Sequence, residues 1–342
     1  MKRYNDGDKN SHGVIMNGLK IYSNQNAIDT LLNMSGSGRL SHSFLFYGES
    51  GLGKKTLAKF LSMLILCEDR QNKPCGKCNP CIKILSNSHP DVILAQHYGK
   101  RGGFEDRMLK ELSLDAYVKP NDGQFKIYIF ADSDNISIKG QNILLKIIEE
   151  PPPHAKFIFT ASGKDIFLPT ILSRVTAIPA QPATREQCRT ALIDAGITDE
   201  GLIDEVINAF GGNIGKCIDA ARNEDIMKAV ANVKNVCKAI ISRNEYALQK
   251  ALFDALSDRA AAFSTFQMLT LIMRDAILYQ SGANSQVMGI DRTLSEQIGG
   301  KFTIDVLIAM IDIFKNSSAL IDRNMSLPLI IAKTTADIFA AL

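Results

Sequence analysis

The chain carries the stretch FLFYGESGLGKKT at residues 44–56, in which a short apolar run leads into glycines and then into a helix-type segment. A phosphate-binding loop has this context: a strand ends in a glycine-rich loop, and a helix begins directly after the loop. Gly48, Gly51 and Gly53 let backbone N–H groups turn inward around a phosphate, and the helix start adds the positive end of its dipole. Lys54 would then reach the outer phosphates. A glycine-rich turn without a ligand has the same pattern, so the stretch predicts the fold and leaves the ligand open.

Two positions on the metal side of this loop depart from what nucleotide hydrolysis needs. The residue after the lysine should offer a hydroxyl to Mg²⁺, but Lys55 stands there. Thr56 comes one position later, about 100° further round a helix, and cannot take that place. At the end of the next core strand an acidic residue is expected first, but Ala131 stands in its place and is followed by Asp132. We therefore expect no ATP turnover by this chain alone and no bound Mg²⁺, while binding of ATP or ADP stays open.

Four of the seven cysteines lie within fifteen residues of one another, at Cys67, Cys75, Cys78 and Cys81. The two C-x2-C steps form a small knuckle, and four thiolates favour tetrahedral Zn²⁺. A closed four-sulfur site has no open position, so we expect a structural zinc. An iron–sulfur cluster and redox-active thiols are the alternatives. The other three cysteines are scattered and are predicted to be small buried apolar residues.

The first half of the chain alternates short apolar runs with helical stretches. Strands are predicted at residues 44–47, 92–94, 126–130, 157–160 and 175–178, and helices at 54–67 and 137–150. Continuous apolar runs are typical of strands that are buried on both faces. The alternation of strand and helix predicts an α/β fold with a parallel sheet.

Strand signals disappear after about Pro182. Three short helices are predicted at residues 184–195, 199–210 and 215–222, and an all-helical region at 223–342. Within that region Ile304, Leu307, Ile308, Ile311 and Phe314 have the spacing of one amphipathic helix face. We therefore expect an all-α part after the α/β part.

Length and composition narrow the classes of protein that remain. A chain of 342 residues suggests two or three domains, and 46% apolar with 22% charged residues excludes a disordered, fibrous or disulfide-stapled protein. The 39 basic and 36 acidic residues are too evenly balanced for an independent nucleic-acid binder with a basic face.

Targeting signals are absent from the sequence pattern. Residues 1–17 are predicted to be a polar tail, because no apolar core follows the first basic residues as it would in a signal peptide. The most apolar stretch, residues 263–279, is interrupted by Arg274 and Asp275, so no membrane helix is expected. We therefore expect a cytoplasmic protein with reduced thiols and no membrane partner.

Three further motifs lie between the cysteines and the helical region. They are Ser88-His89-Pro90-Asp91, the run NILLKIIEEPP at residues 142–152, and Thr170-Ile-Leu-Ser173-Arg174. Together with the altered phosphate loop and the four cysteines, they resemble the bacterial clamp-loader AAA+ subunits of DNA polymerase III. The resemblance extends over residues 18–342, and its specificity lies in the combination of motifs.

Within this family the chain is similar to the delta prime type of subunit, whose ATP site has decayed. Lys55 and Ala131 fit that type, and so does Gly215, which stands where the active subunits carry an arginine that senses the γ-phosphate. The His-Pro-Asp after the knuckle is also similar to delta prime. The alternative within the family is an ATPase motor subunit of the gamma/tau type.

The resemblance implies a domain organisation. It predicts a RecA-like AAA+ core at residues 18–180 with the zinc knuckle at 67–81, a helical lid at 181–222, and a helical collar at 223–342 that holds a pentameric ring together. The collar likeness includes Arg274-Asp275 and the turn Asn324-x-x-Leu327, which a solvated ion pair and a helix cap would also explain.

The resemblance also implies a function. Ser173 and Arg174 would lie at a subunit boundary, with the arginine reaching the γ-phosphate of ATP in a neighbouring subunit, as an arginine finger does. The implied partners are the gamma/tau and delta subunits, with the sliding clamp and primed DNA reached through the ring, in a DNA-directed DNA polymerase holoenzyme. A plain surface ion pair is the alternative for Arg174.

Overall fold

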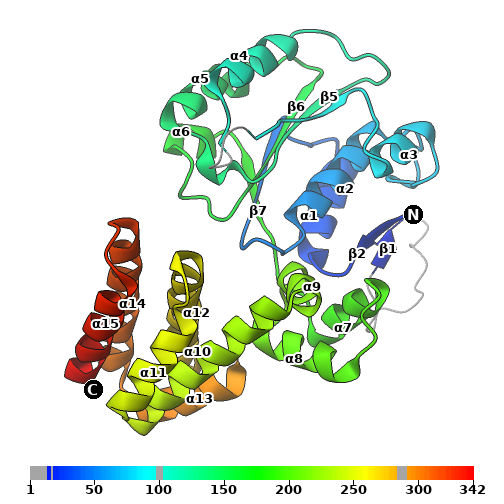
Figure 1. Ribbon diagram of the computed structural model, residues 1–342. Helices are drawn as coiled ribbons and strands as arrows, with labels where there is room; N and C mark the ends of the chain where they lie inside the picture. The colour runs from blue at the N-terminus through cyan, green and yellow to red at the C-terminus, as the bar shows by residue number, and fades with distance from the viewer. Residues whose placement is uncertain (1–13, 17, 98–102, 283–290) are drawn as a thin grey trace. The chain divides into compact units, whose positions relative to one another are not determined.

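The computed structural model describes residues 14–16, 18–97, 103–282 and 291–342 (Figure 1). The chain divides into two compact units, residues 1–191 and 192–342. The finer division into core, lid and collar stays a prediction. Most of the predicted N-terminal tail, residues 1–13 and 17, lies outside the described residues. Residues 14–16 form a strand that pairs antiparallel with the next one.

The first unit contains the strands and the helices between them. Its elements are β1 (Val14–Met16), β2 (Leu19–Ile21), α1 (Gln25–Gly36), β3 (Ser43–Tyr47), α2 (Lys54–Leu66), α3 (Asn79–Leu85), β4 (Val92–Leu94), α4 (Asp106–Asp115), β5 (Lys126–Phe130), the 3-10 turn η1 (Ser133–Asn135), α5 (Ile138–Glu149), β6 (Ala155–Ala161), α6 (Pro169–Leu172) and β7 (Thr176–Pro179). The helix α7 (Arg185–Asp194) spans the division between the units.

Five strands form one parallel sheet in the order β4-β5-β6-β3-β7. The predicted parallel α/β fold is therefore confirmed. β3 lies in the interior of the sheet, with Phe44 opposite Ile158 of β6 on one side and Thr176 of β7 on the other. The loop after β3 consequently leaves the sheet at its carboxyl edge, where ligands bind in open α/β sheets.

Both faces of this sheet are covered by helices, which explains the continuous apolar runs. Phe44, Phe46 and Ile127 belong to a core shared with α1, α2 and α3. Leu45 and Tyr128 point the other way, into a core shared with α4 and α5. Figure 1 shows these two groups of helices on opposite sides of the strands. Most residues of the central strands β3, β5 and β6 are thus buried on whichever face they occupy.

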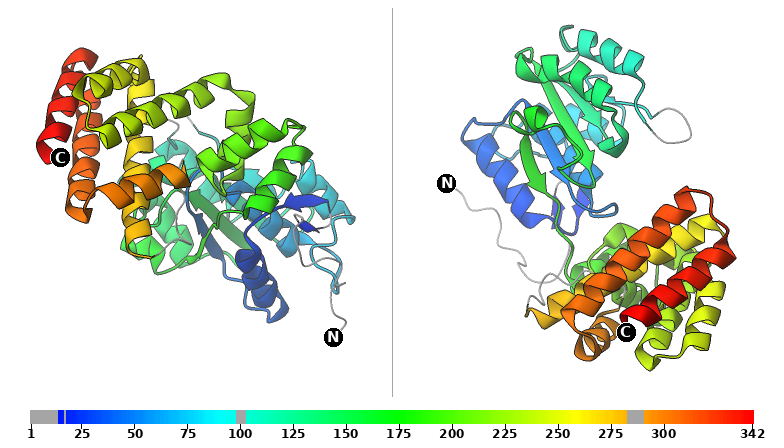
Figure 2. Two further views of the ribbon diagram at one scale, coloured as in Figure 1. Left: turned by 90° about the horizontal axis from the view of Figure 1, so that it is seen from below. Right: turned by 90° about the vertical axis from the view of Figure 1, so that its left-hand side faces the viewer.

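The second unit is helical throughout its described residues, as predicted. Its elements are α8 (Glu200–Phe210), α9 (Ile214–Arg222), α10 (Glu224–Ser242), α11 (Glu245–Ala255), α12 (Arg259–Gln280), α13 (Arg292–Lys301), α14 (Ile304–Asp322) and α15 (Leu327–Ala341). A single apolar core joins α10 to α15, and Figure 2 shows α14 and α15 side by side.

The predicted apolar face of α14 is wrong at its edge. Leu307 and Phe314 are fully buried, but Ile304 and Ile308 are 42% and 47% exposed. Met310 takes part in the buried face instead. An apolar stripe in a sequence can be wider than the surface that neighbouring helices cover, and the pattern alone does not show where that cover ends.

None of the described helices is long and apolar enough to cross a membrane. The interruption noted at residues 274–275 lies within α12, where Arg274 Nη2 and the buried Asp275 Oδ1 form an ion pair at 2.9 Å. The buried Asp275 carboxylate is thus paired with the arginine that precedes it in the helix. The turn before α15 contains Asn324, whose Oδ1 accepts a hydrogen bond from Arg259 at 2.9 Å.

Candidate nucleotide loop and metal centre

The loop between β3 and α2 has the backbone that its glycines predict. Gly48, Gly51 and Gly53 all have positive φ, at 142°, 91° and 81°. A Cβ atom at Gly48 would also come within 3.2 Å of the Ala180 carbonyl oxygen, so both the positive φ and the close backbone contact favour glycine there. The strand–loop–helix context of a phosphate loop is therefore present in the structure.

Lys54, which was predicted to reach outer phosphates, contacts its own loop. Its Nζ donates hydrogen bonds to the carbonyl oxygens of Gly48 at 2.6 Å and Glu49 at 2.7 Å. The side chain is buried, and burial lowers the pKa of Lys54, although the nearby Asp132 and Asp134 act in the opposite direction. To bind a phosphate, Lys54 must exchange these carbonyl contacts.

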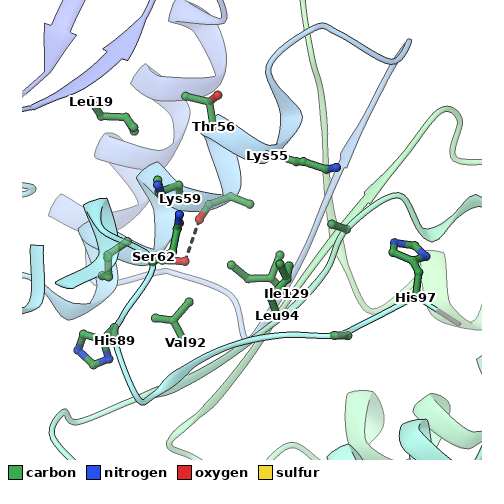
Figure 3. Close-up of a pocket in the computed structure, with 15 residues that line it drawn as sticks. Leu19, Lys55, Thr56, Lys59, Ser62, His89, Val92, Leu94, His97 and Ile129 are labelled. Atoms are coloured by element: carbon green, nitrogen blue, oxygen red, sulfur yellow. Dashed lines mark hydrogen bonds between the residues drawn. The ribbon is translucent and has the colours of Figure 1, made fainter. Parts of the chain in front are cut away.

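An ion pair occupies the metal side of the loop. Lys55 Nζ lies 2.6 Å from Asp132 Oδ2, so the cation in the place of the metal-binding hydroxyl neutralises the acid that remains. Ala131, in the place of the missing acid, is buried and offers no oxygen from its side chain. In Figure 3 Thr56 points away from Lys55, as expected for residues about 100° apart on a helix.

Two further residues hold this region in shape, and sequence reasoning identified neither of them. Asn24 is buried with φ of 70°, and its Nδ2 donates to the Leu52 carbonyl at 2.9 Å. Its Oδ1 accepts a hydrogen bond from the backbone N–H of Gln181 at 2.6 Å, which ties the loop to the segment after β7. The Thr160 hydroxyl accepts a bond from the Asp132 N–H at 2.8 Å. These hydrogen bonds join segments that are far apart in the sequence, so only the folded structure shows them.

The four predicted cysteine ligands come together in the structure. Cys67 ends α2, Cys75 lies in the following loop, Cys78 precedes α3 and Cys81 lies within it. All four sulfur atoms lie within 4.8 Å of one another, and those of Cys67 and Cys78 are 3.9 Å apart. A tetrahedral zinc with Zn–S bonds of about 2.3 Å needs sulfurs about 3.8 Å apart, so the donor set fits this metal.

Hydrogen bonds favour the thiolate form of Cys75. Burial raises its pKa, but N–H groups of Lys77 and Cys78, together with the Cys78 and Cys67 thiols, outweigh it and bring the pKa to about 7. The N–H of Cys78 lies 3.3 Å from the Cys75 sulfur. Cys81 is fully buried, and burial raises its pKa when no metal shares the site. A divalent cation would reverse that preference.

The Ser-His-Pro-Asp motif forms a structural anchor next to this cluster. Asp91 is completely buried and accepts hydrogen bonds from the backbone N–H groups of Asn121, Asp122 and Gly123, at 2.6–3.0 Å. Its own N–H donates to His89 Nδ1 at 3.1 Å. Lys83 of α3 forms an ion pair with Asp122 at 2.5 Å, which connects the anchored turn to the cysteine region.

Arg174 is exposed on the surface of the first unit, after the short helix α6. Its Nη2 lies 3.0 Å from Glu149 Oε1, in the Leu-Leu-Lys-x-x-Glu-Glu-Pro-Pro stretch. Its Nη1 donates to the Thr170 carbonyl at 2.8 Å and the Ser173 hydroxyl at 3.0 Å. The two motifs that were quoted separately from the sequence therefore meet at this arginine.

The motif around Gly215 lies in the second unit, in the first turn of α9. Asn213 precedes that helix, and its side chain accepts a hydrogen bond from the Lys216 N–H at 3.1 Å. Glycine has no side chain, so residue 215 offers no guanidinium at this position of the helix.

Comparison with known proteins identifies related chains. A family model described as DNA polymerase III, delta subunit, matches residues 23–184. The DNA polymerase III subunit delta' of Bacillus subtilis is 25% identical over 261 residues, covering 75% of this chain and 78% of that protein. Subunit gamma/tau of Mycobacterium tuberculosis is 30% identical over 184 residues, covering 52% and 32%. Subunit tau of Bacillus subtilis is 27% identical over 321 residues, covering 84% and 55%.

The extent of these matches differs between the two types of relative. The matched region spans most of the delta' protein but only about a third to a half of the gamma/tau and tau proteins. Among solved structures, the DNA clamp loader delta protein of Bacillus subtilis covers 92% of this chain at 10% identity and a TM-score of 0.39. The likeness rests on the sequence relatives and the motifs. In these the chain is similar to the clamp-loader subunits of bacterial DNA polymerase III.

Proposed function

We propose that this chain is a delta prime-type subunit, which does not hydrolyse ATP and acts on a neighbouring ATPase subunit during sliding-clamp loading. The observation that carries the proposal is the ion pair of Lys55 and Asp132, at 2.6 Å. Mg²⁺ is bound through oxygen ligands, usually carboxylates, hydroxyls and phosphates. At this loop the carboxylate already has a cationic partner on the helix, and the hydroxyl is missing.

The charge balance strengthens this argument. The Lys55 ammonium, in the position of the metal-binding hydroxyl, repels a divalent cation. For Asp132 to bind Mg²⁺, it would also have to give up its attraction to Lys55. The buried Ala131 supplies no second carboxylate. Tight Mg²⁺ binding would therefore require new ligands, which supports the loss of hydrolysis and leaves binding of a nucleotide or a bare phosphate to the loop as a separate question.

Arg174 is suited to act in trans. Its ion pair with Glu149 is exposed, and exposed pairs typically contribute only about 0–1 kcal/mol. Exchange of this carboxylate for a phosphate of a neighbouring subunit therefore costs little. The hydrogen bond from Nη1 to the Thr170 carbonyl meanwhile fixes the direction of the side chain. These features favour an arginine finger over a purely structural ion pair.

The proposal implies a cytoplasmic location and a fixed set of partners. The gamma/tau and delta subunits would be direct neighbours, while the sliding clamp and primed DNA would be engaged through the assembled ring. The cysteine cluster would hold structural zinc and take no part in the reaction.

Turnover of ATP tests the first part. The purified chain is expected to show no magnesium-dependent hydrolysis, alone or with the delta subunit, whereas addition of gamma/tau, clamp and primed DNA restores it. Substantial hydrolysis by the chain alone would instead favour the gamma/tau type of motor, to which relatives of similar identity also point.

Arg174→Ala in the reconstituted loader tests the second part. Loss of an arginine finger lowers stimulated hydrolysis by about 10³-fold or more. Arg39→Ala, at another exposed arginine of the same unit, is the matched control and is expected to leave the rate unchanged. If Arg174→Ala also leaves the rate unchanged while the ring assembles normally, the arginine acts only in its surface ion pair.

A further inference from the structure

A cavity of about 490 Å³ lies on the α2 side of the sheet, against β4 and β5 (Figure 3). Its walls are mostly apolar, and they include Ala58, Ile84, Val92, Leu94 and Ile129. Leu94 is 60% exposed although it is a large apolar residue on the outermost strand of the sheet. The size and lining are those of a small-molecule site.

This cavity is separate from the phosphate loop. Lys55 and Thr56 border it, but none of the loop glycines lines it. From there its lining extends along α2 to Ile84 and His89. Figure 3 shows Lys55, Lys59 and His89 along this path. A nucleotide phosphate cradled by the loop would therefore not fill it.

The charge of the lining is one-sided. Lys55 and Lys59, one helical turn apart, both border the cavity, and no Asp or Glu does so. Lys55 is neutralised by Asp132. Lys59 Nζ donates to the Leu85 carbonyl at 3.1 Å, and no carboxylate pairs with it among the residues that the structure describes.

Lys59 is therefore a half-buried cation beside an apolar surface. Its pKa is lowered by burial, with no charged neighbour contributing. An ammonium with only one carbonyl acceptor retains further N–H donors, and a charge-assisted hydrogen bond to an anion would use them. The Ser62 hydroxyl, one of the polar groups that line the cavity, is already bonded to the Ala58 carbonyl at 2.8 Å.

We propose that this cavity binds an amphipathic organic anion, whose charged group contacts Lys59 and whose apolar body packs against Val92, Leu94 and Ile129. A purely apolar ligand would leave the remaining N–H donors of the Lys59 ammonium without an acceptor, and an inorganic anion would leave the apolar walls uncovered. The class of ligand that satisfies both is a carboxylate or sulfonate with an aliphatic or aromatic body.

Decanoate is a suitable probe, with binding measured by calorimetry on the full chain. Selective ¹³C labelling of isoleucine methyl groups locates the site, because Ile84 and Ile129 line the cavity while Ile330 lies in the core of the other unit. We expect saturable binding with shifts at Ile84 and Ile129 and none at Ile330. Absence of binding, or shifts spread equally over both units, would overturn the proposal.

Two comparisons test the role of the charge. Lys59→Met keeps the apolar stem and removes the cation, so decanoate affinity should fall about tenfold, whereas Lys315→Met on an exposed turn of α14 should have no effect. Decyltrimethylammonium, with the opposite charge, should bind the unaltered chain far more weakly than decanoate does. Equal affinity for both probes, or an unchanged affinity in Lys59→Met, would show an apolar site without selection for anions. Val92→Trp fills the cavity without altering charge and should abolish the Ile129 shift.

Discussion

The phosphate loop and the cysteine cluster lie at the two ends of α2, and they differ in what has been kept. At the N-terminal end the glycine backbone of a phosphate loop is present, while Lys55 and Asp132 form an exposed ion pair where Mg²⁺ ligands would be expected. At the C-terminal end four mostly buried thiols that could hold a metal lie together. The loop can keep its backbone shape without binding a ligand, because the connection from strand to helix still requires this turn. A closed metal site, by contrast, stabilises the fold only if every ligand remains.

Removal of one cysteine of the cluster should have the largest effect on stability. Cys81→Ser replaces a fully buried ligand and should release the metal, since a structural zinc contributes its binding free energy to folding. We expect the first unit to lose about 4 kcal/mol or more, which corresponds to about 8–16 °C in Tm. Elemental analysis and thermal unfolding measure the two effects.

A cysteine outside the cluster provides the control. Cys188→Ala removes another buried thiol, so it should leave the metal content unchanged and cost less stability. One equivalent of zinc in the unaltered chain is the expected result. Iron in its place would identify the alternative cluster, and no metal at all would contradict the structural interpretation.

Asp91 is expected to show the next largest effect, because it anchors the turn that Lys83 of α3 contacts. Asp91→Ala removes the acceptor of three part-buried backbone N–H groups and should cost about 1–3 kcal/mol. Asp91→Asn keeps one oxygen acceptor and should cost less. Chemical denaturation of the purified variants measures both changes, and equal costs would show that the single amide oxygen of asparagine retains none of the stabilisation.

The pH dependence of the Asp91 contribution has a definite sign. Burial raises the pKa of Asp91, but the N–H groups of Asn121, Asp122 and Gly123 outweigh it and hold the pKa below its ordinary value. The unfolded chain therefore binds this proton more readily, so the stabilisation is present above about pH 4 and is lost as the pH falls through the lower folded value. The difference between the unaltered chain and Asp91→Asn should shrink in that acidic range only.

Some features could be predicted from the sequence because their determinants are local. The apolar runs locate the five strands of the parallel sheet, and the C-x2-C spacing locates Cys75, Cys78 and Cys81. The antiparallel pair β1 and β2 was not predicted, since three residues are too short for a periodic signal. Equally, no local pattern indicates that Asn24 bridges residues 52 and 181.

The candidate site shows the same distinction between local and long-range information. The substitutions at Lys55 and Ala131 are visible in the sequence as departures from a motif, and they predict the loss of the metal contacts. That Lys55 pairs with Asp132 depends on the spacing between α2 and the end of β5, which is a property of the folded sheet. The cavity beside Lys59 depends likewise on strands and helices distant in sequence.

Loss of the Lys55–Asp132 ion pair should have the smallest effect on stability. In Lys55→Thr the exposed ion pair is lost, and since exposed pairs contribute about 0–1 kcal/mol, we expect an unfolding free energy within about 1 kcal/mol of the unaltered chain. Addition of Ala131→Asp places a carboxylate at a buried position, so the double variant should lose more stability in the absence of metal. Its new hydroxyl and carboxylate are oxygen ligands of the kind that Mg²⁺ prefers, so its ATP binding should become magnesium-dependent and about tenfold tighter with the metal than without it.

The single substitution Lys55→Met separates these two effects, because it removes the cation without adding a ligand. It should match Lys55→Thr in stability and show no magnesium dependence in an ATP titration. A loss of stability comparable to that of Asp91→Ala would mean that the Lys55–Asp132 pair supports the fold, and the two ends of α2 would then differ less than the structure implies. Restored magnesium dependence in the double variant alone would place the loss of function in the two ligands rather than in the shape of the loop.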